Sequence, residues 1–352
     1  MLGAALHDPL LAALIGGAGG IVLGLAARLG RFCTLGAIED LLYQGSSLRM
    51  RMWLLAMVVA GLGVFTLMAL GLMPQGRTIY HMAPFSPLAS ALGGGLFGYG
   101  MALAGNCGFG ALARAGGGDM RSWVIVLVMG MAAYAAMSGP LAGLRLWLVH
   151  GTALDIQSRD FAALLARGAG LPVWGVGLAL WTVALVALLA SPVLRRQRVA
   201  LAWAVAVGLA IVSGWAGTVH LSRGGFTLIP IESHSFTAPL GETMLYVMTS
   251  SGGGLSFAVG SVLGVLAGAL LGSAIKGHFR WEACEDPREL RRQILGAVLM
   301  GFGAVLALGC TIGQGISAMS VLSYGAPVTF LAILAGAALG LRQLISGFGR
   351  VA

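Results

Sequence analysis

The chain of 352 residues is 58% hydrophobic and only 9% charged, and it contains 57 glycines. This small number of charged side chains cannot cover the surface of a soluble protein of this length. The composition therefore excludes a soluble protein and indicates a membrane protein. The formal net charge of +9 then reflects membrane topology rather than nucleic-acid binding, because the chain has no basic, aromatic-bearing domain that would hold a nucleic acid.

Apolar runs long enough to cross a bilayer as helices follow one another along the chain. They cover about 1–27, 52–72, 86–105, 122–140, 172–192, 199–219, 254–275, 292–309 and 326–345. The first run contains Asp8 and has no Lys or Arg before it, so we interpret it as a span rather than a signal peptide. We therefore predict an all-α integral membrane protein with about nine transmembrane helices.

Four pieces between these runs are too short or too interrupted to cross the membrane. They lie at about 30–46, 106–118, 234–251 and 310–324, and we predict that they are re-entrant short helices. Irregular backbone at membrane depth is tolerated only where protein or a water-filled cavity satisfies its polar groups. Four such pieces therefore predict a central cavity.

Two of these pieces belong to a repeated sequence. The segment GYGMALAGNCGFG at 98–110 matches GFGAVLALGCTIG at 301–313, which aligns Cys107 with Cys310. A weaker match relates Phe32-Cys33-Thr34 to Phe236-Thr237, where the second copy lacks the cysteine. The chain therefore divides into two halves, 1–192 and 199–352, each with two interrupted pieces.

The positive charges predict how these halves are oriented. With the N-terminus outside, most Lys and Arg residues fall on the cytoplasmic side, as the positive-inside rule requires. The two halves then cross the membrane in opposite senses, which makes an inverted repeat, an architecture that many transporters share. The alternative is that the repeat only records a duplication without a role in transport.

The chain has four cysteines, Cys33, Cys107, Cys284 and Cys310. No two of them form a C-x-x-C pair, and no histidine lies close to Cys33, Cys107 or Cys310. We therefore predict no metal site and no structural disulfide. A membrane cysteine can be a small apolar filler. Three of these thiols, however, lie at helix breaks beside Gly or Thr, whereas Cys284 lies in a charged loop and receives no role.

The surroundings of the three thiols suit an anion. Glycines let backbone N–H groups approach a ligand, and a half-helix that starts at a break presents its positive dipole end. Neutral thiols would hold a dianion weakly, so several in series would form shallow sites. We expect Cys33 in the inner half, Cys107 at the waist and Cys310 in the outer half. The predicted path residues are Cys33, Cys107, Cys310, Thr34, Asn106, Gly108, Gly110, Gly309, Thr311, Gly313 and Gln314.

Three carboxylates near the interrupted pieces have two interpretations. Glu39, Asp40 and Glu242 can bind a co-transported cation or proton. The alternative is that they pair with basic neighbours, because buried ionisable groups normally need partners. The candidate partners are Arg31, Arg49 and Arg223.

The motifs RFCTLGAIEDLL, AGNCGFGALARAGGGD and LGCTIGQGISAMS resemble those of the YeeE/YedE family of sulfur-compound transporters, and the resemblance covers nearly the whole chain. It implies an inverted-repeat helical fold with an hourglass-like waist, in the bacterial inner membrane. It also implies thiosulfate uptake past three cysteines, which match Cys33, Cys107 and Cys310. A small sulfur-carrier protein of the TusA type is a further implied partner, although no carrier domain is fused to this chain.

We therefore predict a permease for thiosulfate or a related sulfur anion, not an enzyme, without cofactor and embedded among membrane lipids. A membrane thiol oxidoreductase is one alternative, which requires Cys107 and Cys310 within disulfide reach or a haem or quinone site. A sulfur-species sensor or binding subunit is the other. The sequence leaves open thiosulfate against other sulfur or selenium compounds, the energy coupling and the oligomeric state.

Overall fold

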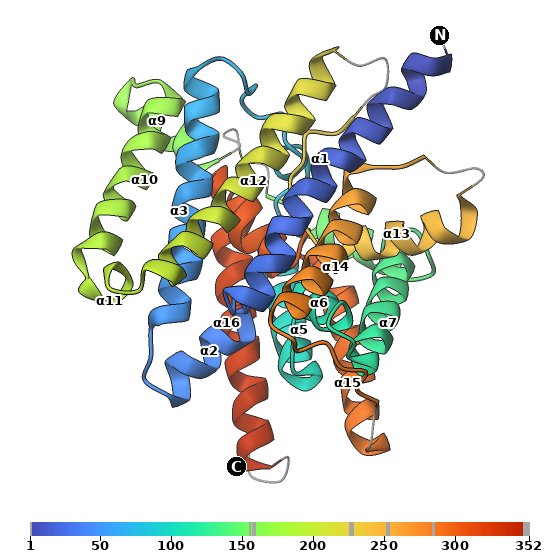
Figure 1. The fold of residues 1–352 in the computed structure, drawn as a ribbon. Coiled ribbons are helices and arrows are strands. Elements are labelled where there is room, and N and C mark those ends of the chain that lie inside the picture. Colours follow the sequence, from blue (N-terminus) through green and yellow to red (C-terminus); the bar gives the residue numbers. More distant parts are fainter. Residues whose placement is uncertain are drawn as a thin grey trace.

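The structure, a computed structural model, describes residues 2–154, 156, 160–224, 229–250, 254–283 and 286–347, with side chains from residue 8 onward. These residues form helices joined by short connections (Figure 1). The helices are α1 (Leu2–Leu29), α2 (Thr34–Tyr43), α3 (Leu48–Ala69), α4 (Ile79–Met82), α5 (Pro87–Ala104), α6 (Gly108–Ala115), α7 (Met120–Met137), α8 (Ala142–Gly151), α9 (Phe161–Ala169), α10 (Val173–Ala190), α11 (Pro192–Arg195), α12 (Arg198–Gly224), α13 (Ala238–Thr249), α14 (Phe257–Ile275), α15 (Pro287–Leu306), the π-helical segment η1 (Gly313–Ala318) and α16 (Gly325–Ser346).

The prediction of an all-α, multi-pass membrane protein is confirmed. Among the described residues, 8 helical stretches are long and apolar enough to cross a membrane, one fewer than we predicted. The predicted span at 292–309 forms α15, which is 20 residues long but is not among the eight. The reason is its charged beginning, which carries Arg288, Glu289, Arg291 and Arg292.

Each of the four interrupted pieces contains a short helix. These are α2, α6 and α13, together with the helical turn around η1. In the first half, α1 with α2 and α5 with α6 form apolar stretches that continue across the breaks, at Asp8–Tyr43 and Pro87–Ala115. The short helices are therefore observed, while their return to the same side of the membrane stays a prediction.

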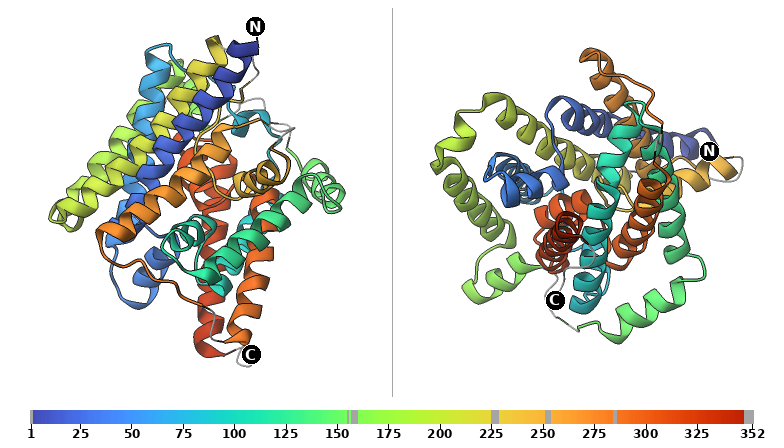
Figure 2. Two further views of the ribbon diagram at one scale, coloured as in Figure 1. Left: turned by 45° about the vertical axis from the view of Figure 1, so that its right-hand side comes forward. Right: turned by 90° about the horizontal axis from the view of Figure 1, so that it is seen from below.

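The order of helices is the same in both halves. The series α1, α2, α3, α5, α6, α7 corresponds to α12, α13, α14, α15, η1, α16. The packing follows this correspondence, because α1 packs on α14 as α3 packs on α12, and α5 packs on α16 as α15 packs on α7. The end-on view in Figure 2 shows the green α10, which follows the first series, at the rim, with α5 and α16 near the middle. The two halves are thus packed into one another.

Glycines bring the central helices α5 and α15 into backbone contact. A Cβ at Gly100 would lie 2.5 Å from the carbonyl oxygen of Gly296, and a Cβ at Gly296 would lie 2.5 Å from that of Gly100. Gly93 and Gly303 form a second reciprocal pair, at 2.6 Å in both directions. Small residues allow this close approach of helices in membranes. We call these four residues the crossing glycines.

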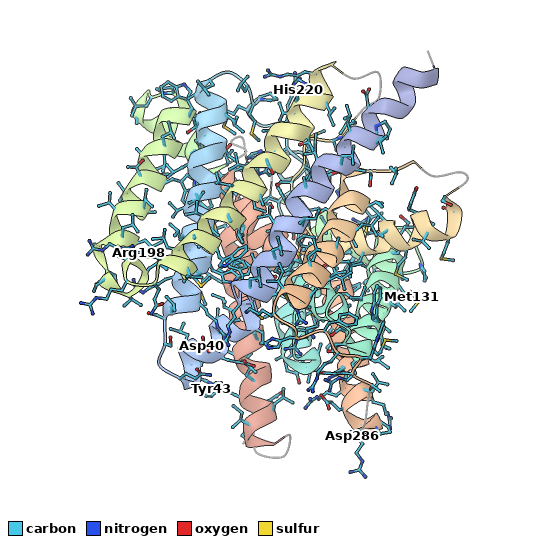
Figure 3. The ribbon with its side chains drawn as sticks, viewed as in Figure 1. Asp40, Tyr43, Met131, Arg198, His220 and Asp286 are labelled. Atoms are coloured by element: carbon cyan, nitrogen blue, oxygen red, sulfur yellow. The ribbon has the colours of Figure 1, made fainter. Side chains whose placement is uncertain are left out.

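The connections gather at two opposite ends of the molecule. In Figure 3, Asp40 and Tyr43 on α2 and Asp286 before α15 lie toward the lower end, whereas His220 lies at the upper end. The N-terminus and α9 also lie at the upper end, and the C-terminus lies at the lower end (Figure 1). Two segments that we predict to be cytoplasmic, α2 and the connection before α15, therefore lie toward the same end of the fold.

This arrangement allows a test of the predicted orientation. A single cysteine introduced at Arg288, in a chain whose native cysteines are replaced by serine, should react with a membrane-impermeant thiol reagent only from the cytoplasmic side. One introduced at Leu164, which is 51% exposed on α9, should react only from outside, because positive-inside charges decide the orientation. Labelling of both positions from the same side would contradict the orientation and the inverted repeat that depends on it.

Candidate functional site

Three thiols lie at breaks with the same backbone conformation. In each break a long helix ends, the residue two positions before the cysteine has a left-handed backbone, and a short helix starts at or just after the cysteine. The left-handed residues are Arg31 (φ 53°), Gly105 (φ 76°) and Leu308 (φ 59°). This conformation costs about 1–2 kcal/mol for a residue with a side chain, so Arg31 and Leu308 hold strained backbone that the surrounding packing must offset.

The sulfur atoms bind backbone N–H groups at the start of these helices. The N–H of Gly110 donates to Cys107 Sγ over 3.4 Å, and the N–H of Gly313 donates to Cys310 Sγ over 3.5 Å. Cys33 has the same position before α2 but its side chain accepts no capping hydrogen bond. Two thiols thus accept hydrogen bonds at helix N-termini, and each keeps one S–H hydrogen that can donate.

The break just before α13 supplies further neighbours of Cys310. The N–H of Phe236, just before α13, donates to Cys310 Sγ over 3.3 Å, and the Ser235 hydroxyl lies 3.8 Å from the same sulfur. The ring of Phe236 also packs against Phe109 of α6, with 5.3 Å between ring centroids. Segments from both halves therefore meet around the thiols.

The three predicted thiols lie near one another. Cys107 interacts electrostatically with both Cys33 and Cys310, and the Thr311 side chain lies beside it. Cys107 and Cys310 are fully buried, Cys33 is partly buried, and all three are free thiols. Cys284 lies outside the described residues. Thiols at corresponding breaks of the two halves therefore lie close together in the fold.

Several buried polar atoms around the thiols have no hydrogen-bond partner. Three of them belong to predicted path residues, namely Thr34 Oγ1, Asn106 Oδ1 and Gln314 Oε1, while the Thr311 side chain hydrogen-bonds to Cys107. An unpartnered buried polar group costs about 1–3 kcal/mol, so these groups are candidates to contact a polar ligand.

Two further residues with an unpartnered buried hydroxyl were not among the predicted path residues. The hydroxyls of Tyr80 and Thr237 are also buried without a partner, and Tyr80 interacts electrostatically with Cys310. Thr237 stands where the repeat aligns Cys33, so the alignment contained a signal for it. Tyr80 lies on the short helix α4 outside every motif, and no sequence pattern indicated it.

The predicted polar and glycine residues have divided roles. Gln314 donates both amide hydrogens to the carbonyl oxygens of Ala307 (2.8 Å) and Leu308 (3.1 Å), so it holds the end of α15 rather than supplying donors to a ligand. Gly309 has φ 154°, a conformation that favours glycine. At Gly108 an added Cβ would lie 2.6 Å from Met129 Cε, which indicates tight packing rather than ligand contact.

Two clefts open near the thiols. The larger, about 670 Å³, extends from α8 to the break before Cys310, and its lining includes Tyr80, His81, Arg145, His150 and Gln314. We call it the wide cleft. The other, about 560 Å³, is lined by Arg28 at the end of α1, Arg114 on α6 and the α14–α15 connection. We call it the arginine cleft. Both contain basic side chains that attract anions.

The carboxylates divide between the two interpretations. Asp40 pairs with Arg49, with 3.1 Å between Oδ2 and Nε, as the pairing alternative predicts. No ion pair within 4 Å involves Glu39 or Glu242 among the described residues. Glu232, which the sequence analysis missed, interacts electrostatically with Glu242.

Glu232 should make the stability of the protein depend on pH. Burial and then Glu242 raise the pKa of this carboxyl from 4.5 to about 8, although its side chain keeps a small exposed edge. Because the folded-state pKa is raised, stability is greatest below the unfolded pKa and falls as pH rises toward 8. The melting temperature of Glu232→Gln minus that of the wild type should therefore grow from about pH 5 to about pH 8 and then level off. Thermal unfolding in detergent measures this, and a difference that is constant with pH would contradict it.

Comparisons with known proteins agree with the geometry. The model of a family described as sulphur transport matches residues 29–339. A protein named thiosulfate transporter TsuA from Escherichia coli (strain K12) is 29% identical over 326 residues, which are 87% of this chain and 87% of that protein. A protein with the same name from Spirochaeta thermophila is 26% identical over 325 residues, covering 89% and 94% of the two chains. The probable transporter YedE of Salmonella typhimurium is 32% identical over 124 residues, 35% of this chain and 28% of that protein. The chain therefore belongs to the sulphur transport family, as its resemblance to the YeeE/YedE transporters predicted.

Proposed function

We propose that this protein takes up thiosulfate or a related sulfur-containing anion across the bacterial inner membrane, along a path lined by Cys33, Cys107 and Cys310. The observation that carries the proposal is the meeting of three free thiols, each at the start of a short helix, beside buried polar atoms without partners. Membership in the sulphur transport family supports the substrate class, and two relatives carry the name thiosulfate transporter.

The thiols suit passage because they interact with an anion without holding it. The N-terminal ends of the short helices carry partial positive charge, which stabilises an anion next to the thiols. The S–H groups of Cys107 and Cys310 can donate to its oxygen or sulfur atoms in place of the neighbouring Thr311 and Ser235 hydroxyls, and such bonds are weak. Conduction requires sites that an ion can enter and leave, so several shallow sites in series serve better than one deep site.

The wide cleft supplies an approach to the first of these sites. Its basic residues Arg145 and His150 raise the local concentration of anions. Tyr80 belongs to the lining of this cleft, and its hydroxyl interacts with Cys310. The path we propose therefore runs from the wide cleft past Tyr80 to Cys310, then to Cys107 and Cys33. A sulfur carrier of the TusA type is the acceptor that the family resemblance suggests on the cytoplasmic side.

Uptake of radiolabelled thiosulfate into proteoliposomes tests the proposal. The purified protein should carry label into the vesicles well above the level of protein-free liposomes, and unlabelled thiosulfate outside should suppress it. Chemical conversion of thiosulfate without accumulation would instead favour a thiol oxidoreductase. Binding without either accumulation or conversion would favour a sensor or binding subunit.

A further inference from the structure

The arginine cleft is built from three segments that are distant in sequence. Its lining residues come from the end of α1, the turn between α6 and α7, and the connection between α14 and α15. Backbone hydrogen bonds join the last two segments, from Arg280 N–H to the Gly117 carbonyl (3.3 Å) and from Glu282 N–H to the Gly118 carbonyl (3.1 Å). Backbone hydrogen bonds therefore hold two walls of the cleft together.

Positive charge exceeds negative charge in this cleft. Four arginines line it, Arg28, Arg114, Arg121 and Arg280, against two carboxylates, Asp119 and Glu282. Both carboxylates contact Arg121, at 3.3 Å from Asp119 Oδ1 and 3.7 Å from Glu282 Oε2. No carboxylate within 4 Å pairs with the other three arginines in the part of the chain that the structure describes. Among the residues that line the cleft the excess is two positive charges, while Glu289, 3.8 Å from Arg121, and Glu39, which interacts with Arg114, lie outside the lining.

Two of the arginines without a carboxylate within 4 Å among the described residues, Arg28 and Arg114, interact with each other. Arg28 Nε donates to Ser273 Oγ over 2.6 Å, and its guanidinium packs over Gly117, where a side chain would collide with it. Arg114 repels the Arg28 guanidinium, while Glu282 and Asp119 attract it more weakly. An arginine at a helix C-terminus ordinarily complements the helix dipole, but that role does not require two guanidinium groups to share one cleft. A bound anion between them would offset the repulsion.

The cleft also lies next to the thiol-bearing helices. Arg28 is near the end of α1, directly before the break that carries Cys33, and Arg114 is in the last turn of α6, whose N-cap is Cys107. Because a helix rises 1.5 Å per residue, Arg114 lies about 10 Å along α6 from Cys107. Two of the three thiols thus lie on segments that line this cleft or directly follow a helix that lines it.

We propose that the arginine cleft is a binding site for a small divalent oxyanion at the cytoplasmic end of the thiol path. This inference rests on the proposed function, since the transported anion would be one occupant. Guanidinium groups bind oxyanions through charge and paired N–H donors. The cleft therefore recognises sulfate as well as thiosulfate, whereas the thiols respond to the soft sulfur atom of thiosulfate.

Thermal unfolding of the purified full chain in detergent tests this site, with sulfate and thiosulfate titrated separately. Both anions should raise the melting temperature of the wild type in a saturable way. Arg114→Gln and Arg28→Gln should weaken half-saturation by about tenfold or more, because charge-assisted hydrogen bonds are lost. Arg114→Lys should restore part of the response. Arg198→Gln, an exposed arginine on α12 that is not part of the cleft lining, is the matched control and should respond like the wild type.

Two further arms separate this site from the thiol path. Cys107→Ser should keep the sulfate response in full, because the arginines bind without the thiol. In proteoliposomes, sulfate enclosed in the vesicles should inhibit thiosulfate uptake by the wild type but much less by Arg114→Gln. Equal sulfate responses in the wild type and in both glutamine variants would overturn the site even if uptake is normal. Absent uptake with an intact, arginine-dependent sulfate response would instead overturn only the proposed function.

Discussion

Cys107→Ser should retain the fold and lose at least about nine-tenths of thiosulfate uptake, since about 1.4 kcal/mol of added barrier slows a step tenfold. Serine keeps an acceptor for the Gly110 N–H that Cys107 Sγ now accepts, so the helix cap survives. Only the soft, polarisable sulfur and its S–H group are lost. Cys107→Ala should show the same transport defect, with a further stability loss of about 1 kcal/mol from the missing cap.

The comparison of the two variants separates transport from packing. If Cys107 were only a filler in an apolar core, both variants should transport near the wild-type rate, because the volume change is small. We expect Cys33→Ala and Cys310→Ala to lose uptake as well, and Cys284→Ala to be silent. Initial uptake rates, normalised to the monodisperse protein recovered by gel filtration, measure these effects. Normal uptake by a well-folded Cys107→Ala or Cys310→Ala variant would rule out the thiol path.

Gly296→Val should abolish folding rather than transport alone. Even a Cβ at this crossing glycine would lie 2.5 Å from the Gly100 carbonyl oxygen and 2.7 Å from the Ala104 nitrogen. Both obstacles are backbone atoms of α5, which cannot move aside as a flexible side chain can. Overpacking typically costs about 1–3 kcal/mol, and a clash between the two central backbones should exceed this range. We expect little or no monodisperse protein in detergent, with the same outcome for Gly100→Val.

Gly95 on α5, the helix that carries Gly100, provides the control. At Gly95 an added Cβ would meet no atom within 4 Å, so Gly95→Ala should fold normally. Alanine is also the better helix former, by about 1 kcal/mol in a helix interior. Size-exclusion profiles and melting temperatures of both variants measure the contrast. Folded, stable Gly296→Val protein would show that α5 and α15 do not cross in backbone contact.

The sequence predicted features that depend on local composition and on repetition. Low charge and long apolar runs identified a membrane protein, because the bilayer excludes charged side chains wherever the chain crosses it. The repeated glycine and cysteine motifs located the breaks at Cys107 and Cys310, and the structure starts short helices there. The predicted span at α15 is not among the eight long apolar stretches, because the beginning of this helix is charged.

The tertiary structure decided which distant residues share a site. Tyr80 and Glu232 belong to no motif with a recognisable spacing, and only the packing of distant segments brings Tyr80 to Cys310 and Glu232 to Glu242. We predicted that Gln314 donates to the ligand, but its amide hydrogens donate to two backbone carbonyl oxygens just after α15.

The arginine cleft shows the same division between sequence and fold. Its residues were visible in the sequence only as positive charges of the cytoplasmic side. The sequence by itself therefore determined the solvent of this protein, the places where its helices break and the thiols at those breaks, because each depends on residues close together in the chain. The fold determined the clefts, the crossing of α5 and α15 and the partners of each polar group, because these depend on contacts between segments hundreds of residues apart.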